Sequence, residues 1–368
     1  MTTSPKTWRI ALAAGGTGGH VYPAMAVLQA LLERKPPPEI YFLGRKSGLE
    51  RRLVESLPVK YVGLSVAGIP RRLSLRWITS PLLALGAFLR SVWMFLGRRP
   101  QLVIGFGSYV AAPVVLAALC LGIPTIIHEQ NAVPGIVNRV LAPFATRTLL
   151  SVEDTARLLP RANSRVVGIP LRREILHAPA EPHSLGLEPG RNTLLLFGGS
   201  QGARRLCQVA AEAMPRLESD LADWQTLFIT GPNNYEEVCS KPLPPKVIVK
   251  DYVEAMGTAY TSASLVIARA GAVSLAEITA AGLPAILIPL PIATGGHQAK
   301  NAEILQRQGA AVVIEDARLT PDTLAEAVRA LVRDPERRRS MAASSKALGR
   351  PGATQTFLKE IDSVCRPC

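Results

Sequence analysis

The chain of 368 residues is apolar and strongly basic. Hydrophobic residues make up 48% of it, which excludes an intrinsically disordered protein, and the length exceeds what one hydrophobic core usually supports. A formal charge of +14 comes with only 5% aromatic residues and with no nucleic-acid recognition motif. These properties predict a globular protein of two domains that does not bind nucleic acid.

A glycine-rich turn follows the first predicted strand. Residues 10–14 form a short apolar run typical of a buried strand, and residues 23–34 predict a helix. Between them lie Gly15-Gly16-Thr17-Gly18-Gly19-His20. Glycine backbone N–H groups can bind a phosphate, and an imidazole can accept a hydroxyl proton near neutral pH. The turn therefore predicts a site that binds a phosphate or accepts a proton, although a plain strand-to-helix connection capped by His20 has the same pattern.

The second predicted strand, residues 40–43, argues against two familiar phosphate-binding proteins. The dinucleotide fingerprint requires G-x-G-x-x-G and an acidic residue at the end of the second strand, whereas Gly44 and Arg45 follow here. A Walker loop requires Gly-Lys-Ser/Thr, which does not follow these glycines. The sequence therefore still predicts a doubly wound α/β fold, but it argues against an ordinary nicotinamide dehydrogenase.

The next segment combines positive charge with the most lipophilic part of the chain. Residues 1–170 hold 20 Lys and Arg against 7 Asp and Glu, whereas residues 171–368 hold 22 against 21. Residues 77–96 are long enough to cross a bilayer, but Pro81, Gly86 and Arg90 interrupt them. We expect an interfacial helix on anionic membrane lipids, with a true span and a buried core helix as alternatives. Its expected lipid contacts are Arg71, Arg72, Arg76, Trp77, Ile78, Leu82, Phe88 and Trp93.

Short apolar runs alternate with helical patterns through both halves, which indicates parallel βαβ units. The expected strands are 10–14, 40–43, 103–105, 125–128 and 148–151, then 193–197, 226–230, 246–250, 265–268, 285–289 and 311–314. The expected fold is α/β, with two Rossmann-like domains of parallel sheets flanked by helices. The domains are residues 1–168 and 169–350, and a last helix within 351–368 is expected to pack back on the first domain.

Two further glycine turns precede helices in the second half. Residues 198–203 follow a predicted strand, and Gly271 precedes the helix predicted over residues 272–281. Helix N-termini offer N–H groups and a favourable dipole to a diphosphate, and Glu277 can accept hydrogen bonds from ribose hydroxyls. No D-x-D pair occurs in the sequence. A reaction that needs no metal or other cofactor is therefore expected.

Cysteine usage favours a reducing compartment. The five cysteines are an odd number, and no secretory signal precedes the first strand. Cys365 and Cys368 form a lone C-x-x-C near the chain end, which we interpret as incidental rather than as a metal or redox site. A cytoplasmic protein is expected.

Five motifs occur in order: the turn ending in His20, Gly105-Phe106-Gly107-Ser108-Tyr109-Val110, His128-Glu129-Gln130-Asn131, Gly198-Gly199-Ser200-Gln201-Gly202-Ala203, and Arg269-Ala270-Gly271-Ala272 through Glu277. Over essentially the whole chain they resemble the MurG family of bacterial glycosyltransferases. The resemblance implies a GT-B fold with a cleft between its domains. It also implies inverting transfer of N-acetylglucosamine from UDP-N-acetylglucosamine to the C4 hydroxyl of the muramoyl sugar of lipid I (undecaprenyl-pyrophosphoryl-muramoyl-pentapeptide), forming lipid II. The enzyme would attach peripherally to the cytoplasmic face of the inner membrane, beside other cell-wall synthesis enzymes.

The resemblance also assigns roles to residues. It implies that His20 is the catalytic base and that Thr17 and Asn131 orient the acceptor and the imidazole, with His128 as an alternative base. The acceptor diphosphate is expected at the loop residues Gly15, Gly16, Gly18, Gly19, Gly107, Ser108 and Tyr109. UDP-N-acetylglucosamine is expected at Thr17, Gly18, Gly19, Asn131, Arg172, Ser200, Gln201, Val253, Arg269, Gly271, Ala272, Glu277, His297 and Gln298.

Four residues depart from the family pattern, and three other functions stay open. Ser108, Ile169, Ala270 and His297 stand where the family commonly has Gly, Asn, Ser and Gln, which affects diphosphate and sugar contacts. A diacylglycerol galactosyltransferase would share the fold, the basic face and the donor loops. A sugar-nucleotide 2-epimerase would not need a basic, lipophilic surface. A noncatalytic membrane scaffold would not explain the glycine–histidine turn.

Overall fold

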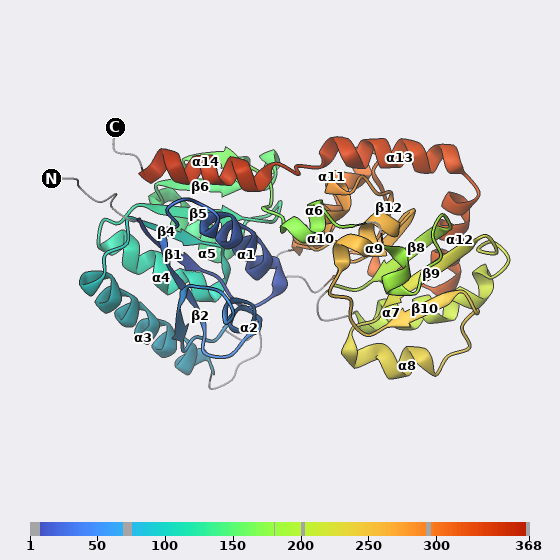
Figure 1. The fold of residues 1–368 in the computed structure, drawn as a ribbon, viewed down its shortest axis with the longest axis horizontal. Coiled ribbons are helices and arrows are strands. Elements are labelled where there is room, and N and C mark those ends of the chain that lie inside the picture. Colours follow the sequence, from blue (N-terminus) through green and yellow to red (C-terminus); the bar gives the residue numbers. More distant parts are fainter. Residues whose placement is uncertain (1–7, 69–75, 180, 200–202, 292–295, 366–368) are drawn as a thin grey trace. The chain divides into compact units, whose positions relative to one another are not determined.

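The chain folds into two compact units (Figure 1). The computed structural model describes residues 8–68, 76–179, 181–199, 203–291 and 296–365. Unit 1 comprises Met1–Arg172 and Gly352–Cys368, and unit 2 comprises Arg173–Pro351. The divisions thus fall close to the boundaries expected from the sequence.

Unit 1 contains a seven-stranded parallel sheet in the order β3-β2-β1-β4-β5-β6-β7 (Figure 1). Its elements are β1 (Arg9–Ala13), α1 (Gly18–Leu32), β2 (Glu39–Arg45), α2 (Leu49–Val54), β3 (Lys60–Leu64), α3 (Arg76–Gly97), β4 (Leu102–Gly105), α4 (Ser108–Cys120), β5 (Thr125–Glu129), α5 (Ile136–Leu141), η1 (Ala142–Phe144), β6 (Arg147–Leu150), η2 (Glu153–Leu158), β7 (Ser164–Val166) and α14 (Ala353–Cys365).

Helices cover both faces of this sheet. Successive strand residues point to opposite faces, and in β1 the residues on both faces are apolar. Ile10 and Leu12 pack with α1 and with Phe357 of α14. Ala11 and Ala13 point the other way, and their small side chains lie against α4, beside α3. Both faces of β1 are therefore buried, which explains why its sequence is a continuous apolar run rather than an alternating one.

The last helix, α14, belongs to unit 1 and packs along α1 (Figure 1). Arg34, which follows the end of α1, lies 2.8 Å from the Asp362 carboxylate, and Thr354 donates a hydrogen bond to the Leu171 carbonyl at 3.2 Å. Phe357 and Ile361 are fully buried against the sheet. These contacts anchor the end of the chain to the first unit.

Two strands and the start of α1 differ from the expectation. β3 and β7 form the two edges of the sheet, so each pairs with another described strand on one side only. Both strands are short, and most of their residues are half-exposed or exposed. β7 has no apolar run and that of β3 is short and mostly half-exposed, so their strand conformation depends on pairing with β6 and β2. α1 begins at Gly18 rather than at Pro23, so that Pro23 lies inside the helix and His20 lies in its first turn.

Unit 2 contains a six-stranded parallel sheet in the order β10-β9-β8-β11-β12-β13, and all six strands were expected. Its elements are α6 (Arg173–Leu176), η3 (Pro182–Leu185), β8 (Asn192–Phe197), α7 (Arg204–Ala213), η4 (Met214–Leu217), β9 (Trp224–Ile229), η5 (Pro232–Asn234), α8 (Tyr235–Cys239), β10 (Val247–Lys250), α9 (Met256–Ser262), β11 (Leu265–Ala268), α10 (Ala272–Ala280), β12 (Ala285–Leu287), α11 (His297–Arg307), β13 (Ala311–Val313), η7 (Asp316–Arg318), α12 (Pro321–Val332) and α13 (Pro335–Leu348).

Each sheet has one point where the strand order reverses. In unit 1 it lies between β1 and β4, and in unit 2 between β8 and β11. The connections after these neighbouring strands run to opposite faces of the sheet, which is where open α/β sheets bind ligands. We call these places the unit 1 and unit 2 switch points.

Candidate functional site

The glycine turn and His20 lie at the unit 1 switch point. The turn follows β1, and Phe106 follows the neighbouring strand β4. Nδ1 of His20 lies 2.9 Å from the Phe106 carbonyl oxygen, so the two loops meet at this partly buried ring. A carbonyl only accepts hydrogen bonds, so Nδ1 carries the proton and donates it. In the neutral ring Nε2 then carries the lone pair that a general base uses.

Positive backbone φ angles shape both loops. Gly16, Gly107 and Ser108 have φ of 97°, 79° and 69°. A Cβ atom on Gly107 would lie 3.2 Å from His20 Nδ1, so this glycine also makes room for the imidazole. Ser108 is the one non-glycine residue with positive φ in the described part of the chain. Its departure from the glycine common in the family therefore leaves backbone strain in this loop.

Several other expected site residues lie at the start of α1 or pack against it. Thr17 is the exposed N-cap, and its carbonyl accepts the N–H of His20 at 3.1 Å, while its hydroxyl makes no capping bond. Gly18 is buried and Gly19 partly buried. The Arg172 guanidinium stacks over the Tyr22 ring, 4.4 Å from its centre. Thr17 and Arg172 are thus brought to the same helix as His20.

His128 is buried with both ring nitrogens in use. Its Nε2 donates to the Gly168 carbonyl at 3.0 Å, and its Nδ1 accepts from Gln130 Nε2 at 3.1 Å. Burial lowers the pKa of His128 to about 4, so the ring is neutral at physiological pH. This environment gives His128 a structural role and argues against the alternative that it is the base.

Glu129 organises the loop that carries Asn131. Its Oε1 accepts from the Asn131 backbone N–H at 2.9 Å and from Asn131 Nδ2 at 3.2 Å. Its Oε2 accepts from Asn138 Nδ2 at 2.7 Å and from the Gly135 N–H at 3.0 Å. The carboxylate is 2% exposed and bonded on both oxygens, so it positions Asn131 rather than facing a ligand. Sequence reasoning placed Glu129 in a motif without a role and missed Asn138, because their partners become visible only in the fold.

A second buried carboxylate lies against the glycine turn. Glu50 is fully buried and accepts from Arg45 Nε at 3.0 Å, which raises the pKa of the Arg45 guanidinium. Arg45 Nη2 donates to the Gly16 carbonyl at 3.3 Å. A Cβ atom on Gly15 would lie 2.7 Å from Glu50 Oε1, so packing requires glycine there. Arg45 had served only to exclude a dinucleotide site, and its contact with the turn was missed.

The unit 2 switch point brings together the loops after β8 and β11. Gly199, with φ of 88°, follows β8, while Ser200 and Gln201 lie outside the described residues. Gly271 is the N-cap of α10 and Ala272 is its first residue, as the sequence predicted. The first N–H groups of α10 are therefore placed at the switch point, where they can stabilise an anion.

Glu277 of α10 is held by a tyrosine that the sequence did not reveal. Glu277 is 8% exposed, and its Oε2 accepts a hydrogen bond from the Tyr260 hydroxyl at 2.8 Å. Tyr260, from α9, is itself 2% exposed and packs against Phe197. A buried hydroxyl needs a partner, and this one fixes the carboxylate that was expected at the ribose.

The Arg269 side chain forms a buried ion pair that the sequence did not reveal. Its Nη1 lies 2.6 Å from Asp316 Oδ1 and 3.1 Å from the Ile288 carbonyl oxygen, and the residue is 6% exposed. A buried guanidinium requires an anionic partner, and Asp316 supplies it from a distant part of the sequence. The ion pair fixes the loop around Ala270 and Gly271, and the expected contact of Arg269 with a diphosphate stays a prediction.

The other donor residues lie on neighbouring loops of unit 2. Gln298, next to His297 at the start of α11, accepts the Leu290 N–H at 2.9 Å. Asn301 of the same helix, which the sequence did not single out, donates to the Ala270 carbonyl at 3.3 Å. Val253 is 6% exposed, so little of this residue is accessible to a ligand. The start of α11 is thus tied to the loops after β11 and β12.

Helix α3 buries one side, which includes Phe95, and exposes large apolar residues on the other. Ser80, Ala87 and Ser91 are buried on the side that packs against α4. The opposite side forms an apolar stripe, 52–79% exposed, of Ile78, Leu82, Leu85, Leu89, Trp93 and Leu96. Phe88 was expected in this stripe but packs on the core. Arg71, Arg72 and the side chains of Arg76 and Trp77 lie outside the described residues.

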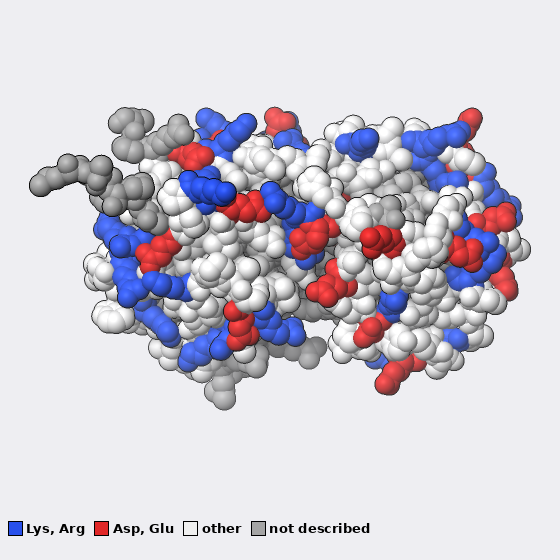
Figure 2. All heavy atoms as spheres, in the orientation of Figure 1, with Lys and Arg blue, Asp and Glu red and all other residues white. Residues whose placement is uncertain are grey.

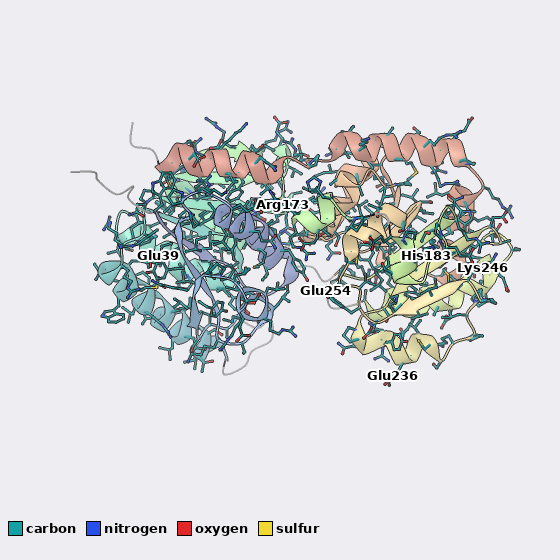
Figure 3. All side chains as sticks on the ribbon, viewed as in Figure 1. Glu39, Arg173, His183, Glu236, Lys246 and Glu254 are labelled. Atoms are coloured by element: carbon teal, nitrogen blue, oxygen red, sulfur yellow. The ribbon has the colours of Figure 1, made fainter. Side chains whose placement is uncertain are left out.

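Charged residues also gather away from the switch points. Glu39 begins β2 (Figure 3) and accepts hydrogen bonds from Lys60, Tyr41 and Arg9. Its bond from Lys60 is the main reason why the pKa of Glu39 falls to about 2. Within the described ranges, no group of three or more His, Cys, Asp or Glu is arranged to hold a metal ion.

Two doubly wound parallel sheets with glycine turns at their switch points define the GT-B class of fold. A solved structure described as Acinetobacter baumannii MurG matches with a TM-score of 0.77 and 29% identity over 97% of this chain and 99% of that one. A putative UDP-N-acetylglucosamine 2-epimerase from Listeria monocytogenes matches with a TM-score of 0.72 over 97% and 96%. At 13% identity, that second likeness concerns the fold alone.

The sequence comparisons are more specific. The family models described as glycosyltransferase family 28 N-terminal domain and C-terminal domain match residues 10–150 and 193–357. A relative from Halothermothrix orenii is 41% identical over 97% of this chain and 99% of its own length. It is named UDP-N-acetylglucosamine–N-acetylmuramyl-(pentapeptide) pyrophosphoryl-undecaprenol N-acetylglucosamine transferase. The chain belongs to glycosyltransferase family 28, and its resemblance to MurG is confirmed.

Proposed function

We propose that this protein transfers N-acetylglucosamine from UDP-N-acetylglucosamine to lipid I and thereby forms lipid II. The observation that carries the proposal is the full-length match, at 41% identity, to a transferase named for this donor and this acceptor. The diacylglycerol galactosyltransferase alternative is not favoured by that relative. The 2-epimerase alternative shares the fold without close sequence similarity.

His20 is the base in the proposed reaction. Nε2 of His20 removes the proton from the C4 hydroxyl of the muramoyl sugar as that oxygen attacks C1 of N-acetylglucosamine. The C1–O bond to UDP breaks on the opposite face, so the α-linked donor becomes a β-1,4 product. The proton remains on the imidazole and the negative charge leaves with UDP. Thr17 and Asn131, positioned by α1 and by Glu129, orient the acceptor.

Unit 2 stabilises the leaving diphosphate without a metal in this proposal. The N-terminus of α10 at Gly271 and Ala272 offers backbone N–H groups and the positive end of the helix dipole. Glu277 accepts hydrogen bonds from the ribose, and the Arg269–Asp316 ion pair keeps the loop rigid. EDTA should therefore leave the rate unchanged.

The first test is transfer of radiolabelled N-acetylglucosamine to a short-chain lipid I analogue in the presence of EDTA. A labelled disaccharide-lipid is expected. UDP-galactose with diacylglycerol serves as the comparison reaction. Galactose transfer to diacylglycerol without transfer to lipid I would overturn the substrates, and restoration of activity only by added Mg²⁺ would overturn the metal-free step.

The apolar stripe of α3 is the proposed site of attachment to the cytoplasmic face of the membrane. Among the described residues, Ile78–Gly97 is long and apolar enough to cross a bilayer by length and composition. Its packing on α4 instead favours a helix that lies on the lipid surface. Exposed Arg90, Arg98 and Arg99 belong to the same region, and Figure 2 shows Lys and Arg bordering uncharged side chains where Figure 1 places α3. These cations favour anionic lipids.

Liposome binding tests the attachment. Leu89→Glu with Trp93→Glu should abolish binding to vesicles that contain anionic lipid, because both side chains are exposed in the stripe. Leu158→Glu is the matched control, since Leu158 is 45% exposed on η2, outside the stripe. Wild-type binding should weaken with salt. Equal binding to neutral vesicles at high salt would contradict the proposed role of charge.

A further inference from the structure

A chain of hydrogen bonds connects His20 to the interior of unit 1. His20 Nδ1 lies 3.2 Å from Gln130 Oε1, and Gln130 Nε2 lies 3.1 Å from His128 Nδ1. His128 Nε2 in turn lies 3.0 Å from the Gly168 carbonyl oxygen. Gln130 is 3% exposed and His128 is fully buried, so their hydrogen-bond partners within the protein determine which atoms carry the protons.

The Phe106 carbonyl fixes one end of this chain. Two polar atoms approach it, His20 Nδ1 at 2.9 Å and Gln130 Nε2 at 3.1 Å. Because a carbonyl oxygen only accepts, both neighbours must donate. A flipped Gln130 amide would place two oxygens against each other at this point. The amide therefore directs its NH₂ to Phe106 and its Oε1 to His20.

The Gly168 carbonyl fixes the other end in the same way. It accepts from His128 Nε2, so the proton of the neutral His128 ring lies on that nitrogen and Nδ1 carries a lone pair. Gln130 Nε2 must then donate to His128 Nδ1 with its second proton. The orientation of the amide is thus required independently from both ends of the chain.

We propose that Gln130 is a positioning residue that holds His20 in the tautomer with the proton on Nδ1 and the lone pair on Nε2. Its Oε1 accepts the Nδ1–H bond alongside the Phe106 carbonyl, so the ring is held by two acceptors on one nitrogen. The other tautomer would place the Nδ1 lone pair against both oxygens. The catalytic consequence of this inference rests on the proposed role of His20 as the base.

Gln130 performs this role without a charge. In the Ser-His-Asp arrangement a carboxylate orients the imidazole and also favours its protonated form. Here the two groups on Nδ1 are an amide oxygen and a backbone carbonyl, both neutral. Gly107, where a Cβ atom would lie 3.2 Å from Nδ1, leaves the ring room to reach them.

The tautomer can be measured directly on the intact protein by NMR with ¹⁵N-labelled histidine. The chain has five histidines, and His20→Gln identifies the signals of His20 by their loss. We expect a protonated Nδ1 and an unprotonated Nε2 for His20, and the reverse for His128. A proton on Nε2 of neutral His20 would overturn the inference whether or not any variant folds.

Gln130→Leu tests the consequence for turnover. Loss of Oε1 leaves the Phe106 carbonyl as the single one of these two acceptors on Nδ1, so the share of the other His20 tautomer should rise. We expect kcat to fall by on the order of tenfold to a hundredfold, with an unchanged Kd for UDP. Gln225→Leu is the matched control, because Gln225 in unit 2 is 4% exposed and its amide bonds the Glu188 backbone. A folded Gln130→Leu protein with wild-type tautomer and kcat would overturn the inference. Absence of transfer by the wild type would instead refute the proposed function, while the tautomer remains measurable.

Discussion

The two switch points have the same topology and different side-chain chemistry. Each places a glycine turn after one central strand beside a loop after the neighbouring strand, with backbone N–H groups at a helix N-terminus. At the unit 1 switch point, neutral groups converge on His20. At the unit 2 switch point, two carboxylates are held by side chains, since Arg269 pairs with Asp316 and Tyr260 donates a hydrogen bond to Glu277.

The proposed function divides one architecture between two tasks, and this difference in side chains fits that division. Backbone N–H groups at a switch point suit any phosphate, so the topology alone does not distinguish donor from acceptor. An oriented neutral imidazole suits proton transfer, whereas a rigid loop with a fixed carboxylate suits binding of a nucleotide. Substitutions at the two switch points should therefore affect different steps.

The largest effect is expected from His20→Ala. Removal of the proposed base should lower kcat by on the order of a thousandfold and leave the Kd for UDP unchanged, because His20 belongs to the unit that we propose to bind the acceptor. Steady-state kinetics and calorimetry measure the two quantities. His183→Ala is the control, since His183 lies exposed in unit 2 (Figure 3). A parallel loss of UDP affinity would contradict the expectation that substitutions at the two switch points affect different steps.

A smaller effect is expected on stability, through His128. Its pKa is about 4 in the folded protein against an ordinary value of 6.5, so below pH 6.5 the unfolded chain binds a proton that the folded chain does not. The free energy of unfolding should fall as the pH drops from 6.5 to 4, by about 3 kcal/mol in total. Denaturant titrations of wild type and His128→Asn should differ in this pH dependence. Identical pH dependence would contradict a buried neutral ring.

Tyr260→Phe should affect the unit 2 switch point alone. Loss of the 2.8 Å bond to Glu277 leaves that carboxylate less fixed, and a hydrogen bond to a charged group is worth about 1.5 kcal/mol. UDP affinity should fall about tenfold, as 1.4 kcal/mol is a factor of ten. With saturating UDP-N-acetylglucosamine, kcat should stay near wild type. A loss of kcat at unchanged affinity would move Glu277 from binding to catalysis.

The smallest effect is expected from Ser108→Gly. Glycine adopts the φ of 69° without strain, which should stabilise the protein by up to about 1 kcal/mol. The bond from the Val110 N–H to Ser108 Oγ, at 3.3 Å, offsets part of this gain. Thermal unfolding measures the change in stability. In unit 2, Gly199 already has glycine at a φ of 88°, so that loop offers no such gain. A lower Tm would show that the hydroxyl matters more than the strain.

Local sequence patterns sufficed for most of the fold. The strands with partners on both sides are buried on both faces, so each has an apolar run bounded by turn residues, and every one of them was predicted. The edge strands β3 and β7 were missed because a half-exposed strand needs no such run. The positions of the glycine turns, of His20 and of Glu277 also follow from the sequence, since a turn before a helix has local requirements.

Tertiary structure decided which side chains these residues meet. Gln130 lies 110 residues from His20, and Asp316 lies 47 residues from Arg269, so no local pattern pairs them. The exposed stripe of α3 likewise depends on which face α4 covers, which the apolar composition of the helix does not indicate. The sequence by itself determined the parallel α/β units and the positions of the loops that we propose to carry the chemistry. Only the fold determined the tautomer of His20, the burial of His128 and the ion pair of Arg269, because each depends on groups that packing brings together.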